Sequence, residues 1–97
     1  MSTTAVVHIP EAGRYEIHVD GRSAGFTQAK DRDDGTVLFP HTVIDDAYEG
    51  QGLGSILVAG ALDDVRRSGK RIHVTCEYVN GFLEKHPEYE DLLAEQG

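Results

Sequence analysis

Residues 48–55 read YEGQGLGS, with glycine at every second position from Gly50 to Gly54. A helical pattern of apolar residues follows at once and ends near Gly69. Glycine has no Cβ atom to hold a ligand away from the backbone, and it permits the positive φ angles of a sharp turn. The first amides of a helix lack intrahelical partners and attract anions. The stretch therefore predicts a strand-to-helix loop that binds a phosphate or pyrophosphate, and the alternative is a turn that only caps the helix.

Two common phosphate-binding loops do not fit this stretch. The dinucleotide pattern G-x-G-x-x-G fails because Leu57 stands where a third glycine would have to follow Gly52 and Gly54. The loop of the nucleoside triphosphatases requires Gly-Lys-Ser or Gly-Lys-Thr, and the sequence contains neither tripeptide. What remains is the pattern x-G-x-G-x-G at a junction between a strand and a helix.

The segment before the loop predicts four strands. Residues 5–9 form a short apolar run, and residues 15–19 alternate between apolar and polar side chains, which is typical of a half-buried strand. Asp20 and Gly21 then suit the positive φ angles of a tight hairpin. The return strand covers about residues 22–30 and a fourth strand about residues 36–44. The first half of the chain is therefore expected to be an antiparallel four-strand meander.

Pro40 lies inside the predicted fourth strand. Because proline has no backbone N–H, it is confined to sheet edges, strand starts and bulges. Pairing along one side of this strand must therefore be interrupted, or the strand is an ordinary edge strand.

The segment after the loop predicts a helix, a strand and short helical pieces. The expected buried stripe of the helix is formed by Leu53, Ile56, Leu57, Ala61 and Val65. Residues 71–76 then read as a fifth strand, and a right-handed helical crossover places such a strand parallel to the one before the helix. A short helix and a second piece broken by Pro87 end the chain. Residues 1–97 are thus expected to form a single α/β (α+β) domain.

Composition narrows the class of function. The net charge of -8 argues against general binding to nucleic acid, whose affinity depends on cationic contacts to phosphate, although an acidic surface also serves solubility alone. No apolar run approaches the roughly 20 residues of a membrane span, and the N-terminus lacks the pattern of a signal peptide. We therefore expect a cytoplasmic protein without membrane contact. The single cysteine and five scattered histidines show no metal-ligand spacing, so no metal site is expected.

Three motifs together resemble one family. Residues 49–54 resemble the pyrophosphate loop Gln/Arg-x-x-Gly-x-Gly/Ala of the Gcn5-related N-acetyltransferases, the GNAT superfamily, except that Glu49 occupies the first position and Gln51 is expected to supply the polar contact. The sequences Cys-x-Tyr-Val at residues 76–79 and Lys-His-Pro-Glu-Tyr at residues 85–89 follow. Their order and spacing resemble the minimal GNAT proteins of the YjdJ type.

The resemblance implies a minimal GNAT fold, in which a central helix crosses from the meander to a parallel fifth strand and short helices end the chain. It implies an acetyl-CoA-dependent N-acetyltransferase that acts on a primary amine, either a small molecule or a protein lysine. The helices with which larger members grip the acceptor are missing, so the acceptor site is open or is completed by a protein partner. The residues expected to bind the coenzyme are Val43, Ile44, Glu49, Gly50, Gln51, Gly52, Leu53, Gly54, Ser55, Tyr78, Asn80, Phe82, Lys85 and His86.

Some of these residues have structural alternatives. His86 precedes Pro87 and also suits the end of a helix, because the residue before a proline avoids the helical conformation. Tyr78 is expected to shield the thioester or donate a proton. Tyr78, Asn80 and Phe82 also suit packing or helix capping.

Cys76 and His41 are the residues expected nearest the chemistry. Cys76 lies at the end of the predicted fifth strand, where its thiol would act as a general acid or as an acetyl-accepting nucleophile. The alternative is a small buried apolar residue, which is the common role of a free cysteine. His41 shares its predicted strand face with Val37, Phe39 and Val43, and would take the proton of the amine or hold Cys76 as a thiolate, unless it is only a hydrogen-bonded strand residue.

The sequence is also compatible with two other functions. The first is a noncatalytic acyl-CoA-binding or partner-regulating module that kept the coenzyme pocket without efficient turnover. The second is an interaction domain that binds no coenzyme, which requires the glycine loop to be a mere turn.

Overall fold

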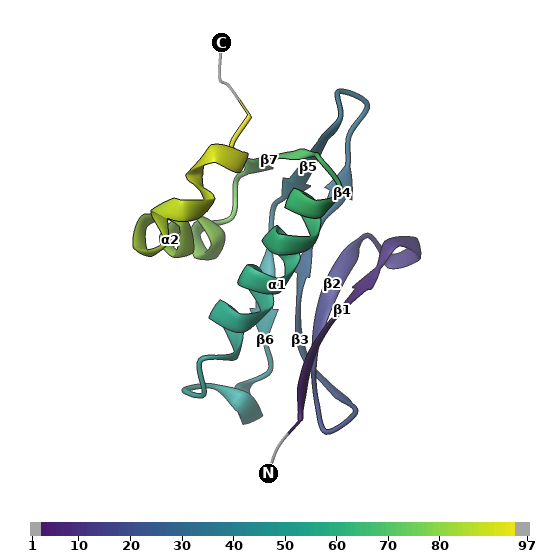
Figure 1. The fold of residues 1–97 in the computed structure, drawn as a ribbon. Coiled ribbons are helices and arrows are strands. Elements are labelled where there is room, and N and C mark those ends of the chain that lie inside the picture. Colours follow the sequence, from purple (N-terminus) through teal and green to yellow (C-terminus); the bar gives the residue numbers. More distant parts are fainter. Residues whose placement is uncertain (1–2, 95–97) are drawn as a thin grey trace.

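The computed structural model describes residues 3–94, and its strands form two small sheets that share one helix (Figure 1). The first sheet has the order β1-β2-β3-β6 and the second has the order β4-β5-β7. The strands of the first sheet are β1 (Thr4–Ile9), β2 (Arg14–Val19), β3 (Arg22–Gln28) and β6 (Thr42–Ile44), and all neighbours in it are antiparallel. A short 3-10 helix, η1 (Pro10–Ala12), joins β1 to β2.

The second sheet contains the predicted parallel pair. It is formed by β4 (Lys30–Asp31), β5 (Thr36–Phe39) and β7 (Arg71–Val74), with β5 parallel to β7. The helix α1 (Leu53–Arg67) makes the crossover between these strands and ends before Gly69, whose φ of 72° suits the left-handed turn. The predicted meander, helical crossover and parallel fifth strand are confirmed.

The predicted fourth strand is divided, and its second half faces the other way. The chain forms β5 up to Phe39, passes through Pro40 and His41, and resumes as β6 in the first sheet. Val37 and Phe39 are buried before the break, whereas Val43 is exposed after it. Beyond the break the chain continues in the first sheet, where it pairs with β3, so a face assigned across the break from a period of two is wrong. The predicted return strand is divided in the same way, between β3 and β4.

The helix α1 supplies most of the shared core. Its buried residues are Leu53, Gly54, Leu57, Val58, Ala61, Leu62 and Val65. Each fully buried aliphatic side chain contributes about 1.5–3 kcal/mol relative to an exposed one. Ile56 was expected in this stripe, but 46% of its surface is exposed. It lies in one row with Gly60 and Asp64, four residues apart, which runs beside the edge strand β1 rather than over the centre of the sheet.

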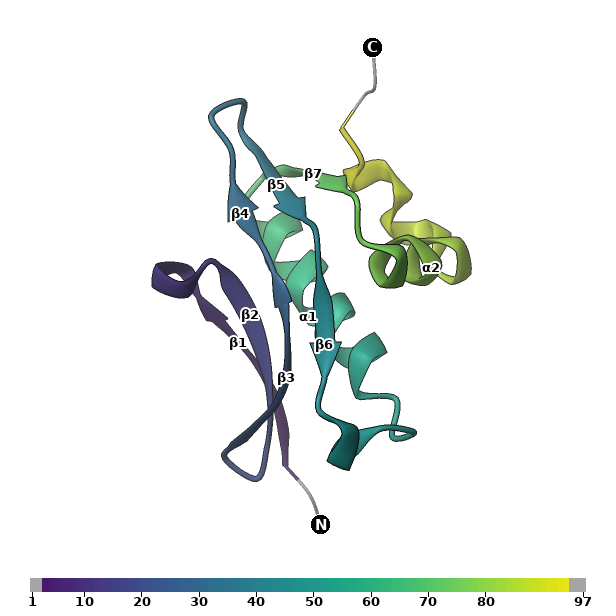
Figure 2. The same ribbon diagram turned by 180° about the vertical axis from the view of Figure 1, so that it is seen from behind.

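The C-terminal part contains the helix α2 (Glu77–Lys85) and the 3-10 helix η3 (Pro87–Leu92). The predicted fifth strand stops at Val74, so Cys76 is the residue that caps α2 rather than a strand residue. Seen from behind, β1, β2, β3 and β6 present a face that no helix of residues 3–94 covers (Figure 2). Within the same residues, no helix has both the length and the apolar character needed to cross a membrane.

Candidate functional site

A hollow of about 450 Å³ lies where β6, the glycine loop and the start of α2 meet. Its wall contains Thr42 and Ile44 from β6, together with Tyr78 from α2. The loop contributes Tyr48, Glu49, Gly50, Gly52, Leu53 and Gly54. The arrangement therefore gathers the glycine loop and one strand edge around a single cavity.

The glycine loop leaves its backbone open to this hollow. Gly50 and Gly52 have φ angles of 81° and 72°, in the left-handed region that favours glycine. Apart from the glycine itself and its chain neighbours, no heavy atom of residues 3–94 lies within 4 Å of the place where a Cβ of either residue would stand. Gly52 is also the N-cap of α1 and has no side-chain oxygen to bond the first amides of the helix. These amides and the helix dipole fit a phosphate or pyrophosphate.

Tyr78 separates this hollow from a second one of about 310 Å³ and lines both. A Cβ added at Gly54 would overlap the Oη and Cζ atoms of Tyr78, so the ring end lies directly on the first turn of α1. Among the residues that line the second hollow are Ser55, Phe82, Lys85 and His86. The ring of Phe82 stacks on that of His86 with centroids 4.3 Å apart. Tyr78, of which 45% of the surface is exposed, thus forms the wall between the two hollows.

The strands separate at the hollow. Phe39 O accepts hydrogen bonds from Thr75 N at 3.3 Å and from Cys76 N at 3.1 Å, and beyond this point β6 pairs only with β3. Within residues 3–94, no strand covers the second edge of β6. The backbone groups of that edge are therefore available to a ligand in the hollow.

The sulfur of Cys76 lies one side chain behind the wall of the hollow. Only 5% of Cys76 is exposed, and its Sγ lies 3.5 Å from Thr42 Oγ1. Thr42 Oγ1 in turn lies 2.8 Å from Oγ1 of the fully buried Thr27. A chain of three hydrogen-bonding side chains therefore runs from the thiol past the hollow into the core. Thr27 was not predicted as part of the site, because a threonine in a strand gives no signal for such a contact.

His41 lies on the opposite side of the first sheet. Its side chain is exposed, and its ring stands edge-on to Phe26 with centroids 6.4 Å apart. Phe26 pairs with Val43 in the ladder, so both belong to the face away from α1. Cys76 is therefore connected to the hollow by its contact with Thr42, whereas His41 lies on the uncovered face of the first sheet.

Three predicted coenzyme-binding residues, Val43, Gln51 and Asn80, line neither hollow. Gln51 borders a separate depression with Tyr48 and Arg22 and does not line the main hollow. Asn80 is exposed on α2, where its backbone amide donates to Cys76 O at 3.0 Å. Tyr48 lines the main hollow but was not among the predicted site residues. Its position directly before the loop was the one available signal.

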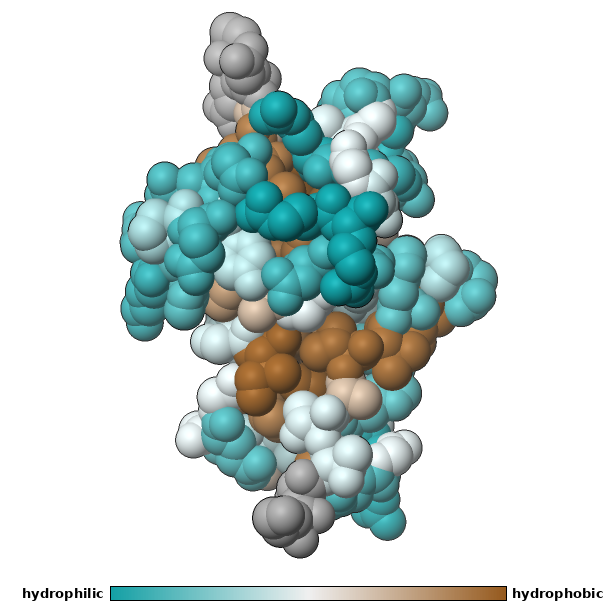
Figure 3. Space-filling model, viewed as in Figure 1, coloured by the Kyte–Doolittle hydropathy of each residue, from teal (hydrophilic) through white to brown (hydrophobic). Residues whose placement is uncertain are grey.

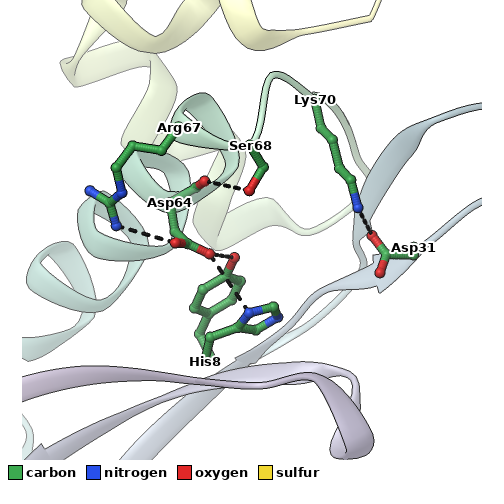
Figure 4. Close-up of polar contacts among 7 residues, drawn as sticks. His8, Asp31, Asp64, Arg67, Ser68 and Lys70 are labelled. Atoms are coloured by element: carbon green, nitrogen blue, oxygen red, sulfur yellow. Dashed lines mark hydrogen bonds and ion pairs between the residues drawn. The ribbon is translucent and has the colours of Figure 1, made fainter.

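A polar cluster near the C-terminal end of α1 is separate from this site (Figure 4). Tyr15 Oη donates to Asp64 Oδ2 at 2.6 Å, and His8 Nδ1 lies 3.7 Å from the same oxygen. Burial and the neighbouring Asp64 raise the pKa of Tyr15, while the hydrogen bond from Tyr15 lowers the pKa of Asp64. The cluster connects β1 and β2 to α1 about 15 Å along the helix from Gly54.

Comparison with known proteins identifies the family. The sequence model described as GCN5-related N-acetyl-transferase matches residues 14–92. The chain belongs to this family. The fold is similar to that of a GCN5-like protein from Staphylococcus aureus, solved by NMR, with a TM-score of 0.72 and 20% identity over 100% of this chain and 94% of that one. It is also similar to the ribosomal-protein-alanine N-acetyltransferase of Brucella melitensis biovar Abortus, with a TM-score of 0.57 and 18% identity over 87% of this chain and 62% of that one.

Sequence relatives match over a shorter segment. Protein NATD1 of Bos taurus is 43% identical over 47 residues, and Protein NATD1 of Homo sapiens is 36% identical over 47 residues. In both cases the match covers 48% of this chain and 42% of the relative, so less than half of the relative's length is represented. The narrower resemblance to the YjdJ type stays a prediction.

Proposed function

We propose that the chain is an acetyl-CoA-dependent N-acetyltransferase that transfers an acetyl group to a primary amine in the cytoplasm. The observation that carries this proposal is the hollow between the free edge of β6 and the glycine loop. It combines an anion-binding helix start with unpaired strand groups, in a chain that belongs to the GCN5-related N-acetyltransferase family.

The glycine loop would hold the pyrophosphate of the coenzyme. The open space above Gly50 and Gly52 is where a side chain would obstruct a bound phosphate, and both backbones need the left-handed conformation. Glu49 lines the same hollow, so we expect its carboxylate to turn away from the phosphates. The second hollow, beside Lys85 and His86, would receive another part of the coenzyme.

The reaction requires an amine to attack a thioester carbonyl, after which the carbon–sulfur bond breaks and the thiolate takes up a proton. Acetyl-CoA would supply that thioester when bound. Backbone groups at the free edge of β6 would orient the carbonyl and stabilise charge on its oxygen. Cys76 would donate the proton toward the hollow through the Thr42 hydroxyl, which it contacts at 3.5 Å. We propose direct transfer in a ternary complex, because Thr42 stands between the sulfur and the hollow.

The acceptor would approach from the uncovered face of the first sheet. The exposed ring of His41 lies on that face and would take the proton of the ammonium group. No helix of residues 3–94 covers this face, which suits a large acceptor such as a protein lysine as well as a small amine. A protein partner would complete the grip on the acceptor.

Calorimetric titration with acetyl-CoA and with free CoA tests the pocket. Gly52→Val places a side chain in the open space above the loop and should abolish binding. Gly35→Val is the matched control, because Gly35 also has a positive φ, of 85°, and open space, but lies in the turn before β5. Equal binding by the two variants, or no binding of either ligand by the unaltered chain, would refute the proposed pocket.

Turnover with an amine acceptor then separates the enzyme from a noncatalytic module. Cys76→Ala should reduce turnover sharply and leave acetyl-CoA binding within about twofold, because the sulfur does not line the hollow. Undiminished turnover in Cys76→Ala would remove the proton-donor role. An unaltered chain that binds acetyl-CoA but acetylates none of a panel of polyamines and lysine peptides would favour the noncatalytic module.

A further inference from the structure

We propose that the edge strand β1 pairs with β1 of a second copy of this chain, so that the two first sheets join into one. β1 (Thr4–Ile9) forms one edge of the first sheet and pairs with β2 alone among the described residues. Natural sheets protect exposed edges with charges, prolines, bulges or very short strands. β1 has six residues, an unbroken register with β2, and no charged residue or proline.

The free backbone groups of β1 can be assigned from the register. Thr3 O accepts from Asp20 N, so the alternation of an antiparallel ladder directs the groups of Ala5, Val7 and Ile9 toward β2. Thr4, Val6 and His8 therefore present their N–H and C=O groups to the outside. This set is symmetric about Val6, so an antiparallel pairing of two copies can place Val6 on the two-fold axis and Thr4 opposite His8. Every outward group then obtains a partner.

An apolar surface beside the β1 edge also favours a second copy of the chain as the partner. Val6 pairs with Ile17 and so faces α1, where its side chain lies against Gly60. Ile56 and the partly exposed Ala59 continue this surface along α1. Figure 3 shows the result as an apolar band across α1 and the neighbouring strand, with strongly hydrophilic residues above it and pale residues of intermediate hydropathy below it. Two copies related by the axis would cover each other's band.

Electrostatic repulsion between two copies of the chain is expected to be weaker at the β1 edge than at other faces of the molecule. The chain carries a net charge of -8, so two copies repel one another at most approaches. β1 contributes no carboxylate, and the nearby Ile56 and Ala59 are neutral. Asp64, the carboxylate beside His8, is paired with Arg67 and accepts a hydrogen bond from Tyr15. Apolar contact and backbone pairing are therefore available there with little like-charge opposition.

Sedimentation velocity between about 1 and 100 µM tests the pairing, since edge pairing with a small apolar contact is expected in the micromolar range. Thr4→Pro removes an outward N–H and should weaken the dimer at least about tenfold. Thr4→Ala removes the same side chain and keeps the N–H, so it should leave the dimer unchanged. Ile56→Glu should also weaken it, whereas Leu93→Glu, at another exposed apolar residue, should not.

The register has its own test. Residues that face each other in a hydrogen-bonded antiparallel pair have Cα atoms about 5.5 Å apart, within the range of a disulfide. In a Cys76→Ala background, Val6→Cys should therefore form a covalent dimer faster than Thr4→Cys or His8→Cys, and circular dichroism establishes that each variant is folded. A monomer across the whole concentration range would overturn the proposal. So would a dimer insensitive to Thr4→Pro and Ile56→Glu, because another surface or another partner would then be responsible.

Discussion

Replacing Gly54 by alanine should disturb the position of Tyr78 without unfolding the chain. The added Cβ would overlap the end of the Tyr78 ring, and even Cε1 would lie 3.0 Å away. The backbone of Gly54 is helical and does not have a positive φ, so alanine meets no strain there. Because the ring is 45% exposed, it can rotate outward. The wall between the two hollows is then lost.

Gly54→Ala is expected to change the thermal stability little and the acetyl-CoA affinity more. Alanine gains up to about 1 kcal/mol over glycine inside a helix, and less near its first turn. This gain offsets the lost contact of the ring, so the thermal midpoint should move by only a few degrees. A well-placed aromatic contact contributes about 0.5–1.5 kcal/mol, so acetyl-CoA affinity should fall by about two- to tenfold.

A double-mutant cycle measured by calorimetric titration checks the cause. If Gly54→Ala acts by moving the ring, it should weaken acetyl-CoA binding in the unaltered chain and have almost no effect in a Tyr78→Ala background. Equal losses in both backgrounds would refute this reasoning. They would mean that the new methyl group obstructs the ligand itself.

Three further predictions concern stability. Gly81→Ala should raise the thermal midpoint by several degrees, since Gly81 lies within α2 and its added Cβ would meet no atom of the described chain within 4 Å outside its own helix backbone. An unchanged midpoint in a melting curve would contradict this. The raised pKa of Tyr15 gives stability that is complete below its ordinary pKa of about 10 and is lost at higher pH, so Tyr15→Phe should flatten the alkaline limb of a denaturation series. Hydrogen bonds from His18 and Arg14 lower the pKa of Glu16 in the folded chain. The stabilisation of the folded state by Glu16 is therefore present above about pH 4.3 and is lost as the pH falls. Glu16→Gln should flatten the acid limb of the same denaturation series.

The strand order and the glycine loop could be predicted because their signals are local. The hairpin at Asp20 and Gly21 has φ angles of 51° and 83°, as its dipeptide indicates. Pro40 marked the interruption in the fourth strand correctly, because the missing N–H acts at one position. The glycines at 50 and 52 adopt the positive φ angles that glycine accepts most readily.

Other features depend on tertiary structure and could not be predicted. A constant period of two placed His41 with Val37 and Phe39, but at Pro40 the chain passes from the second sheet to the first, and His41 is exposed there. Ile56 fits the helical period equally well as a core residue, and only the position of α1 beside β1 exposes it. The contact between Thr42 and Cys76 joins residues 34 positions apart, across the two sheets. No local pattern encodes a contact of that kind.

The division of one predicted strand between two sheets has a mechanical consequence. Cys76 is held by its backbone to Phe39, at the end of β5, while Thr42 belongs to β6 and is held by its hydroxyl to Thr27 in the first sheet. The separation of Cys76 Sγ and Thr42 Oγ1 therefore changes whenever the two sheets open or close relative to each other. The only thiol of the chain is thus a natural probe of that angle, and its reactivity toward a small alkylating reagent would follow the opening of the hollow without any added label.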